Sequence, residues 1–503
     1  MNYFIALIII YCLLFAVLSW RRTNLALAIL IFALPAYLIR FQIGFMPMTL
    51  LEAMILILFA VWLMKWMTSF VALRGSSPLR RTSERGLAPQ GDKNGNNKIF
   101  SGYGWLILLF LLAAAAAVFI SDNRLAALGV WKAYFIEPVL FFIVLINVIK
   151  RREDWNLIIW ALGLSALAVA LPAVYQKFNG FGITTLSWFS EETRRVTSWY
   201  GYPNAIGLYL GPIVVLFFGL LWLQITLRLV VPPRSGQANR YKCYKSSLQI
   251  TNYELPITNY QSRFLFFIFV VIAGLAAIIF AKSEGAIIGA AAGMIFFSVF
   301  CLNKKNRIVS LVLLVSLILL VSLIPSTRNY AVEKATFSDL SGQIRMEQWR
   351  ETWNMLKDGR LLTGAGLANY QQSVAPYHQQ GIWIKDKSDP DWLKKVLFNE
   401  EYRKKHWQPT EIYLYPHNFF LNFWSEIGLF GLLTILAILI KFIADYWSLK
   451  DVEIRKRYLV LMAVMLAIFI HGLVDVPYLK NDLSVFWWLV LGLAVSIQDK
   501  QSK

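Results

Sequence analysis

Hydrophobic residues fall along this chain in long uninterrupted blocks, separated by polar connections. Thirteen blocks are each close to the ~20 residues that a helix needs to cross about 30 Å of hydrocarbon. Because the blocks are continuous and do not alternate with polar residues, they predict membrane-spanning helices and not strands of a barrel. The predicted spans are residues 3–20, 24–40, 47–68, 103–121, 129–149, 155–175, 204–227, 263–281, 284–302, 308–325, 418–443, 458–474 and 482–498.

Composition supports the same class. Of the 503 residues, 58% are hydrophobic and only 16% are charged, which is too little polar surface for a soluble domain of this size. The start, Met1-Asn2-Tyr3, carries no basic residue, so we interpret residues 3–20 as a retained helix and not a signal peptide. The predicted fold class is all-α: a polytopic membrane protein with about 12–13 transmembrane helices and one large, partly helical extracytoplasmic loop.

Basic residues are concentrated in one alternating set of connections, which the positive-inside rule assigns to the cytoplasm. This set contains Arg21-Arg22, residues 69–102, Lys150-Arg151-Arg152, residues 228–262, Lys304-Lys305 and Arg455-Lys456-Arg457. These loops account for the net charge of +20, so we expect contacts with membrane lipids and no nucleic acid partner.

Four regions follow from this topology. Residues 1–175 hold N-terminal transmembrane helices with a cytoplasmic linker at 69–102, and residues 176–325 hold central helices with a linker at 228–262. Both linkers have a composition that predicts poor order. Residues 326–417 form the large extracytoplasmic loop, and residues 418–503 form the C-terminal transmembrane helices.

The large loop is predicted to begin with a helix. Apolar residues recur there at helical spacing, and Gly359 follows as a stop signal. Arg345 and Trp349 are four positions apart and therefore share one face of that helix. Gly364-Ala365-Gly366 predicts a tight turn before a second helical stretch.

Several ionisable residues lie within apolar spans, where charge is costly and usually faces a partner or a cavity. They are Glu52, Lys132, Glu137, Glu426, His471 and Asp475. His471 and Asp475 are four apart, so a single helix face could carry both, as a structural pair or as the wall of a cavity. For Glu426, deep in its predicted helix, we expect a packing or gating role.

His417 and Asn418 stand where the loop ends and the next helix begins. A histidine in the first helical turn feels the positive end of the helix dipole, which favours the neutral imidazole, and a neutral imidazole can accept a proton from a hydroxyl. The alternative is an interfacial histidine that only caps the helix. Arg345 likewise has two interpretations: a phosphate ligand, or a surface ion pair with Glu347 or Glu351.

Four segments, taken together, resemble the O-antigen ligase and polymerase family. His417-Asn418 is followed by nine residues and Gly428, within a Glu426-x-Gly-Leu-x-Gly431 pattern. The other segments are Arg345-x-x-x-Trp349 with Leu362-Thr-Gly-Ala-Gly366, Arg195 with Gly201-x-Pro-Asn204 and Gly207, and His471-Gly-Leu-Val-Asp475. The resemblance covers about residues 190–480. One departure is clear: the family carries Ser-Arg-Gly before the large loop, whereas this chain reads Lys282-Ser283-Glu284-Gly285.

The resemblance implies catalytic roles for His417 and Arg345. It implies donor binding by Arg195, Arg194, Lys282, Trp349 and Asn418, with His471, Asp475 and Glu426 as candidate cavity residues. Lys282 would stand in for the family arginine as a point charge without its planar, bidentate contact.

The implied function is a membrane glycosyltransferase of the bacterial inner membrane. It would transfer or polymerise a glycan from an undecaprenyl pyrophosphate carrier onto a glycan, lipid or protein acceptor, with inversion and without metal or cofactor. His378 and His406 have no ligand spacing, and Asp389-Pro-Asp391 is interpreted as a solvated turn. The alternatives are a polysaccharide or lipid-carrier transporter (a flippase) and a non-catalytic partner in envelope assembly.

Overall fold

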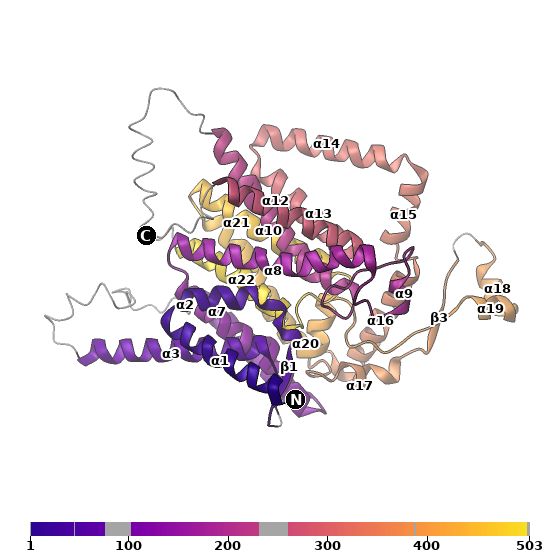
Figure 1. Ribbon diagram of the computed structural model, residues 1–503. Coiled ribbons are helices and arrows are strands. Elements are labelled where there is room, and N and C mark those ends of the chain that lie inside the picture. Colours follow the sequence, from indigo (N-terminus) through magenta and orange to yellow (C-terminus); the bar gives the residue numbers. More distant parts are fainter. Residues whose placement is uncertain (1, 45, 76–101, 231–259, 387–388, 500–503) are drawn as a thin grey trace.

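The computed structural model describes residues 2–44, 46–75, 102–230, 260–386 and 389–499. Helices dominate it, which confirms the predicted all-α class (Figure 1). The first half contains α1 (Asn2–Arg21), α2 (Thr23–Phe32), α3 (Leu50–Gly75), α5 (Gly104–Ile120), α6 (Arg124–Trp131), α7 (Glu137–Val148), α8 (Arg152–Asn179), α9 (Leu186–Phe189) and α10 (Pro203–Val230). The long helices of the second half are α12 (Tyr260–Phe280), α13 (Glu284–Cys301), α14 (Lys304–Ser322), α20 (Phe419–Ser448), α21 (Val452–Gly472) and α22 (Asn481–Asp499).

Nine helical segments in the described residues are long and apolar enough to span a membrane, and α2 and α5 are shorter apolar helices. Each of the thirteen predicted spans coincides with a helix or a run of helices. The prediction of one helix over 24–40 is wrong, because α2 ends at Phe32 and a short 3₁₀ helix, η1 (Leu34–Leu38), follows with Pro35 in its first turn. The span at 129–149 continues from α6 through a π-turn, η4 (Lys132–Ile136), into α7. The predicted linkers fall mostly on residues 76–101 and 231–259, outside the described residues.

The long helices run side by side, and the core lies between them (Figure 1). Trp487 and Trp488 of α22 are fully buried there. Helix α13 approaches α21 closely, because a Cβ on Gly289 or Gly293 would stand 2.7 Å from a backbone carbonyl of α21. Small residues of this kind permit close backbone contact between membrane helices, where packing and not hydrophobicity drives association.

The charged residues inside the first helices find partners within the bundle, as expected. Lys132 lies 2.8 Å from a carboxylate oxygen of Glu52 and 3.4 Å from one of Glu137. Asn481 donates to the second oxygen of Glu52 at 2.8 Å. The cluster joins α3, the α6–α7 run and α22, and it pairs charge that would be costly in lipid.

Apolar side chains also cover the outside of the bundle. On α1, Leu7 and Leu14 are each 65% exposed, and on α14, Leu313 is also 65% exposed. Figure 1 shows α14 along one edge of the molecule. Exposed apolar surface of this extent marks a contact with lipid in a chain of this composition.

The elements of the large loop gather at one end of the bundle, and α3 extends toward the other end (Figure 1). They are α15 (Pro325–Ala335), α16 (Leu340–Met355), η6 (Leu356–Arg360), α17 (Tyr370–Val374), η7 (Ala375–Tyr377), β3 (Gly381–Trp383), α18 (Trp392–Phe398), α19 (Glu400–Lys405) and β4 (Trp407–Pro409). A second two-stranded ribbon, β1 (Arg40–Ile43) with β2 (Met46–Thr49), precedes α3. The predicted helix before Gly359 is confirmed as α16, and Gly359 follows it with a φ of 77°. It is not the first helix of the loop, because α15 precedes it.

The loop is attached to the bundle at a break in α20. Helical geometry fails at Ile427 and at Gly428, whose φ is 72° and ψ is 177°. The Leu362–Gly366 turn fits into this break: Ala365 N–H donates to the Ser425 carbonyl at 2.6 Å, and Leu429 N–H donates to the Leu362 carbonyl at 3.0 Å. The two glycine motifs of the sequence therefore contact each other.

Candidate active site

His417 lies immediately before α20. The helix begins at Phe419 and Asn418 is its N-cap, so the prediction of His417 in the first helical turn is wrong. The Asn418 side-chain oxygen accepts from the N–H groups of Phe420 and Leu421, each at 3.0 Å, and its amide donates to the Leu473 carbonyl at 3.0 Å. Asn418 thus joins the starts of α20 and of the turn after α21, and donor binding by this residue stays a prediction.

The imidazole of His417 is positioned by α16. Its Nδ1 lies 3.0 Å from the side-chain oxygen of Gln348, and Trp349 Nε1–H donates to the Pro416 carbonyl at 2.9 Å. Because the Gln348 oxygen only accepts, Nδ1 carries the proton and Nε2 is the basic nitrogen. His417 itself has a φ of 45°, a left-handed conformation that costs free energy and that these contacts maintain. The rings of Tyr413 and Tyr415 pack edge to face against the imidazole, each with its centroid 5.1 Å from it.

Arg345 is on the same helix as Gln348, three residues earlier, and is half-buried. Its guanidinium donates to the Ser341 hydroxyl at 2.9 Å. The bond to Ser341 leaves most of the guanidinium's donors available. Its positive charge also acts on His417, because it lowers the pKa of that imidazole.

Three influences act on the His417 pKa. Burial lowers this pKa most, the Asp475 carboxylate raises it, and the Arg345 guanidinium lowers it, with a net decrease below the ordinary value. The imidazole is therefore neutral at neutral pH, which is the form that accepts a proton. Asp475 and Arg345 thus both influence this imidazole, although they come from distant parts of the sequence.

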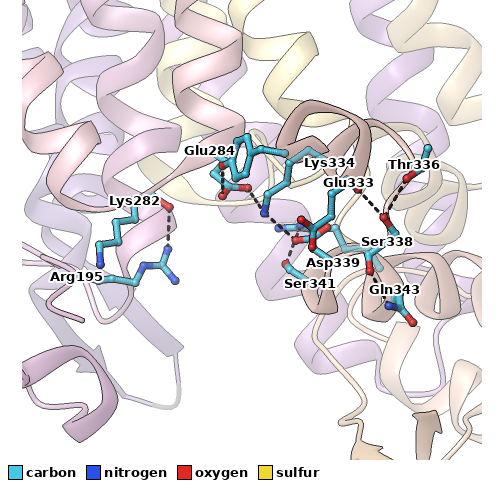
Figure 2. A network of polar contacts seen from close by, with 12 residues as sticks. Arg195, Lys282, Glu284, Glu333, Lys334, Thr336, Ser338, Asp339, Ser341 and Gln343 are labelled. Atoms are coloured by element: carbon cyan, nitrogen blue, oxygen red, sulfur yellow. Dashed lines mark hydrogen bonds and ion pairs between the residues drawn. The ribbon is translucent and has the colours of Figure 1, made fainter. Parts of the chain in front are cut away.

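A polar chain leads from Asp475 to the loop before α10. The Asn204 amide donates to Asp475 at 3.4 Å, and Arg195 donates to the Asn204 oxygen at 3.1 Å. Arg195 also donates to the Ala281 carbonyl at 3.0 Å and to the Lys282 carbonyl at 3.4 Å, and Figure 2 shows the second of these bonds. Lys282 is exposed in a left-handed conformation at a φ of 51°. The structure thus places Arg195 and Lys282 together and connects both, through Asn204, to Asp475.

Arg194 is directed elsewhere. It is buried, and its guanidinium donates to the Phe189 carbonyl at 3.1 Å and the Lys177 carbonyl at 3.0 Å. These bonds fold the loop after α8 onto itself. Its predicted part in donor binding stays a prediction, and its contacts in this structure are with the backbone.

Glu284, which stands where the family carries arginine, ties α13 to the large loop (Figure 2). Its carboxylate lies 2.7 Å from the Lys334 ammonium and accepts from the Tyr330 hydroxyl at 2.8 Å. Lys334 in turn lies 2.8 Å from Asp339, next to the start of α16. We call Glu284, Tyr330, Lys334 and Asp339 the loop clasp. A lysine from α15 thus occupies the neighbourhood of the missing arginine, but two carboxylates surround it.

The remaining predicted cavity residues are buried. Glu426 accepts from the Ala368 N–H at 2.9 Å and so anchors the loop beside the break in α20, consistent with the expected packing role. His471 packs against α13, where a Cβ on Gly285 would lie 2.7 Å from its Cδ2. The prediction that His471 and Asp475 share a helix face is wrong, because α21 ends at Gly472 and Asp475 lies in the following turn.

Sequence reasoning missed Gln348 and Lys480. Gln348 could have been found from its position on the α16 face, between Arg345 and Trp349. The Lys480 ammonium lies over the rings of Tyr200, Tyr37 and Tyr202, with centroids 4.5, 5.2 and 5.4 Å away. Nothing in the local sequence identifies that arrangement, because the tyrosines come from two distant segments. Among the described residues, no group of three or more His, Cys, Asp or Glu side chains is placed to hold a metal ion.

The fold and this site define a polytopic α-helical membrane protein with a polar centre at one end of its bundle. Residues 268–436 match the family model described as O-antigen ligase, a stretch that runs from α12 through the loop to α20 and contains both His417 and Arg345. The match confirms the resemblance over this third of the chain and supports an assignment to the O-antigen ligase and polymerase family. No curated protein matches the sequence.

Proposed function

We propose that this protein is a membrane glycosyltransferase that transfers or polymerises a glycan from an undecaprenyl pyrophosphate carrier. The observation that carries the proposal is the contact of His417 with Gln348, which lies one helical turn from Arg345 on α16, although His417 and Arg345 are 72 positions apart in the chain. A proton acceptor beside a guanidinium suits a reaction in which a hydroxyl loses a proton while pyrophosphate leaves.

In the proposed reaction, Nε2 of His417 removes the proton from the acceptor hydroxyl. The oxygen attacks the anomeric carbon of the donor sugar, and the bond from that carbon to the pyrophosphate oxygen breaks. Attack from the side opposite the leaving group inverts the anomeric centre. Arg345 neutralises the charge that grows on the pyrophosphate, with Arg195 and Lys282 as further cations.

Pyrophosphate is already a good leaving group, so the proposed reaction needs neither a metal ion nor a nucleotide. The protein would act at the outer face of the bacterial inner membrane. The acceptor is a glycan, a lipid or a protein.

The test is transfer of a labelled glycan from its lipid carrier by purified variants. His417→Ala and Arg345→Ala are each expected to abolish transfer with unchanged protein in the membrane. Two matched controls are His406→Ala, in the loop tip, and Arg350→Ala, whose side chain is 67% exposed on α16. Both controls should transfer normally.

Full activity in both site variants would overturn the assigned roles. Movement of the labelled carrier across a vesicle membrane without transfer would instead support a transporter.

A further inference from the structure

Two exposed tryptophans and two cations line a cavity at the tip of the large loop. Strands β3 and β4 pair Trp383 directly with Trp407, and their ring centroids are 4.8 Å apart. The two side chains are 44% and 39% exposed. With Arg403 and Lys404 of α19 they line a shallow cavity of about 220 Å³ that is mostly open to the surface. Large aromatic rings left in water beside cations are typical of a binding site, since burial would otherwise be favoured.

The ribbon holds the tryptophans in fixed positions. A Cβ on Gly381 would lie 2.3 Å from Cζ2 of Trp407, so this ring can lie over β3 only because residue 381 is glycine. Ile384 N–H donates to the His406 carbonyl at 2.8 Å, and Trp392 Nε1–H donates to the Ile384 carbonyl at 2.8 Å. The ribbon and α18 are therefore bonded to one another, which makes the indole pair a preorganised platform.

The two charged residues that line the cavity, Arg403 and Lys404, are both cations. The described residues offer no ion-pair partner to Arg403, and no carboxylate is among the four lining residues. Lys404 lies 2.8 Å from Glu400, but the two side chains are 76% and 68% exposed, and such a pair is worth little. Nearby Asp389 is engaged by Lys395 at 2.8 Å and by the Tyr402 hydroxyl at 2.8 Å. The cavity therefore suits a ligand with one flat, weakly polar face and an anionic group.

The position of the tip distinguishes between two anionic partners. Figure 1 shows β3, α18 and α19 beyond the end of the bundle, away from the long apolar helices. Aromatic and basic residues that contact lipid head groups lie level with the ends of the spanning helices. A soluble polymer reaches the tip more readily than the membrane surface does.

We propose that this cavity binds a sugar residue of an acidic glycan chain. The two indoles are inclined to one another by 58°, so the sugar ring stacks on one of them and touches the other with its edge, while its carboxylate pairs with Arg403 and Lys404. The volume is below the roughly 300–1,000 Å³ of pockets that enclose a whole drug-sized ligand, so one sugar sits in the cavity and the chain continues outside it. That the cavity holds the donor or acceptor chain during transfer rests on the proposed function. That it binds an acidic glycan does not.

The test is calorimetric titration of the full chain in nanodiscs of neutral lipid. A hyaluronan hexasaccharide, which alternates N-acetylglucosamine with glucuronic acid, is compared with neutral chitohexaose. The acidic glycan is expected to bind at least about tenfold more tightly, with an affinity that falls as salt is added. Arg403→Gln with Lys404→Gln should remove this preference, while the neighbouring Lys405→Gln, on an exposed residue that does not line the cavity, should keep it.

Trp383→Ala should weaken the binding of both glycans, and Trp383→Phe should largely restore it. If Trp383→Ala fails to fold, the Arg403→Gln, Lys404→Gln double variant still tests the proposal. His417→Ala should bind both glycans like the wild type. Loss of glycan transfer and loss of glycan binding at this cavity can therefore be distinguished. Absence of binding to the wild type, or an unchanged preference in the double variant, would overturn the proposal. So would quenching, by a spin-labelled lipid head group, of a fluorophore attached at Lys405→Cys in a background with the native cysteines replaced by serine, which would assign the cavity to the membrane.

Discussion

The chemistry of His417 is set by its neighbours and not by its place in the chain. Gln348 fixes the proton on Nδ1, and burial together with Arg345 lowers the pKa, against the opposing effect of Asp475. The neighbours come from two segments distant from His417 in the chain: α16 supplies Gln348 and Arg345, and the turn after α21 supplies Asp475. A neutral imidazole is therefore a property of the folded site.

The pH dependence of transfer should report this imidazole. Because the neutral form is the proposed base, kcat/KM falls as pH drops through the His417 pKa, and that acid limb is expected below the ordinary value of about 6.5. Asp475→Asn removes the carboxylate that raises the pKa, so the acid limb should move to still lower pH. Glu400→Gln, on the loop tip, should leave the profile unchanged. An acid limb that stays in place in Asp475→Asn would contradict the electrostatic role.

At the scale of elements, the site depends on how α16 is held over the start of α20. Two attachments do this. The Leu362–Gly366 turn is bonded into the break at Gly428, and the loop clasp joins α13 to α15 beside α16. In the clasp, the side chains of Glu284 and Lys334 are 47% and 26% exposed. A partly exposed ion pair adds little to the free energy of unfolding, so the clasp mainly helps to position α16. The turn at Gly364 makes the more specific contact.

Gly364→Ala and Gly428→Ala should each destabilise the protein. Their φ values are 69° and 72°, and a Cβ would lie 2.5 Å from the Trp424 carbonyl oxygen and 2.4 Å from the Leu362 carbonyl oxygen, respectively. Strain of this kind costs roughly 1–3 kcal/mol, which should appear as a lower Tm in detergent. Gly129→Ala is the matched control, because a Cβ there meets nothing within 4 Å on helix α6, and its Tm should not fall. If both variants had the same Tm as Gly129→Ala, the proposed fit of the Leu362–Gly366 turn into the break of α20 would be contradicted.

At the scale of the molecule, the bundle separates two kinds of polar surface. The large loop and the His417 site lie at one end, while the basic connections at Arg21-Arg22 and Arg455-Lys456-Arg457 are predicted to face the cytoplasm. The net charge of +20 is consistent with such a cytoplasmic set of loops next to anionic lipids. This orientation puts the proposed chemistry outside, where a lipid-linked donor is presented.

Cysteine labelling tests the orientation. In a background with Cys12, Cys243 and Cys301 replaced by serine, Lys405→Cys in the loop tip should react with a membrane-impermeant maleimide in intact cells. Lys450→Cys, exposed in the connection between α20 and α21, should react only after the cells are opened. Labelling of Lys450→Cys in intact cells, with protection of Lys405→Cys, would reverse the topology and remove the proposed site from the donor's side.

The sequence by itself determined the class of this protein, because blocks of about 20 apolar residues have few stable alternatives to membrane helices. It also predicted α16 and its stop at Gly359, since helical spacing is a local property, and short motifs nominated His417 and Arg345 as site residues, which stays a prediction. Local signals failed at helix ends. Pro35 shortened α2, Asn418 and not His417 began α20, and α21 ended before Asp475.

Only the tertiary structure decided which residues act together. Gln348 against His417, Asn204 against Asp475 and Lys334 against Glu284 are contacts between segments that lie far apart in the chain. The same holds for the fit of the Leu362–Gly366 turn into the break of α20. Such pairings depend on how the helices and the loop pack, and a periodicity of three or four residues carries no information about them.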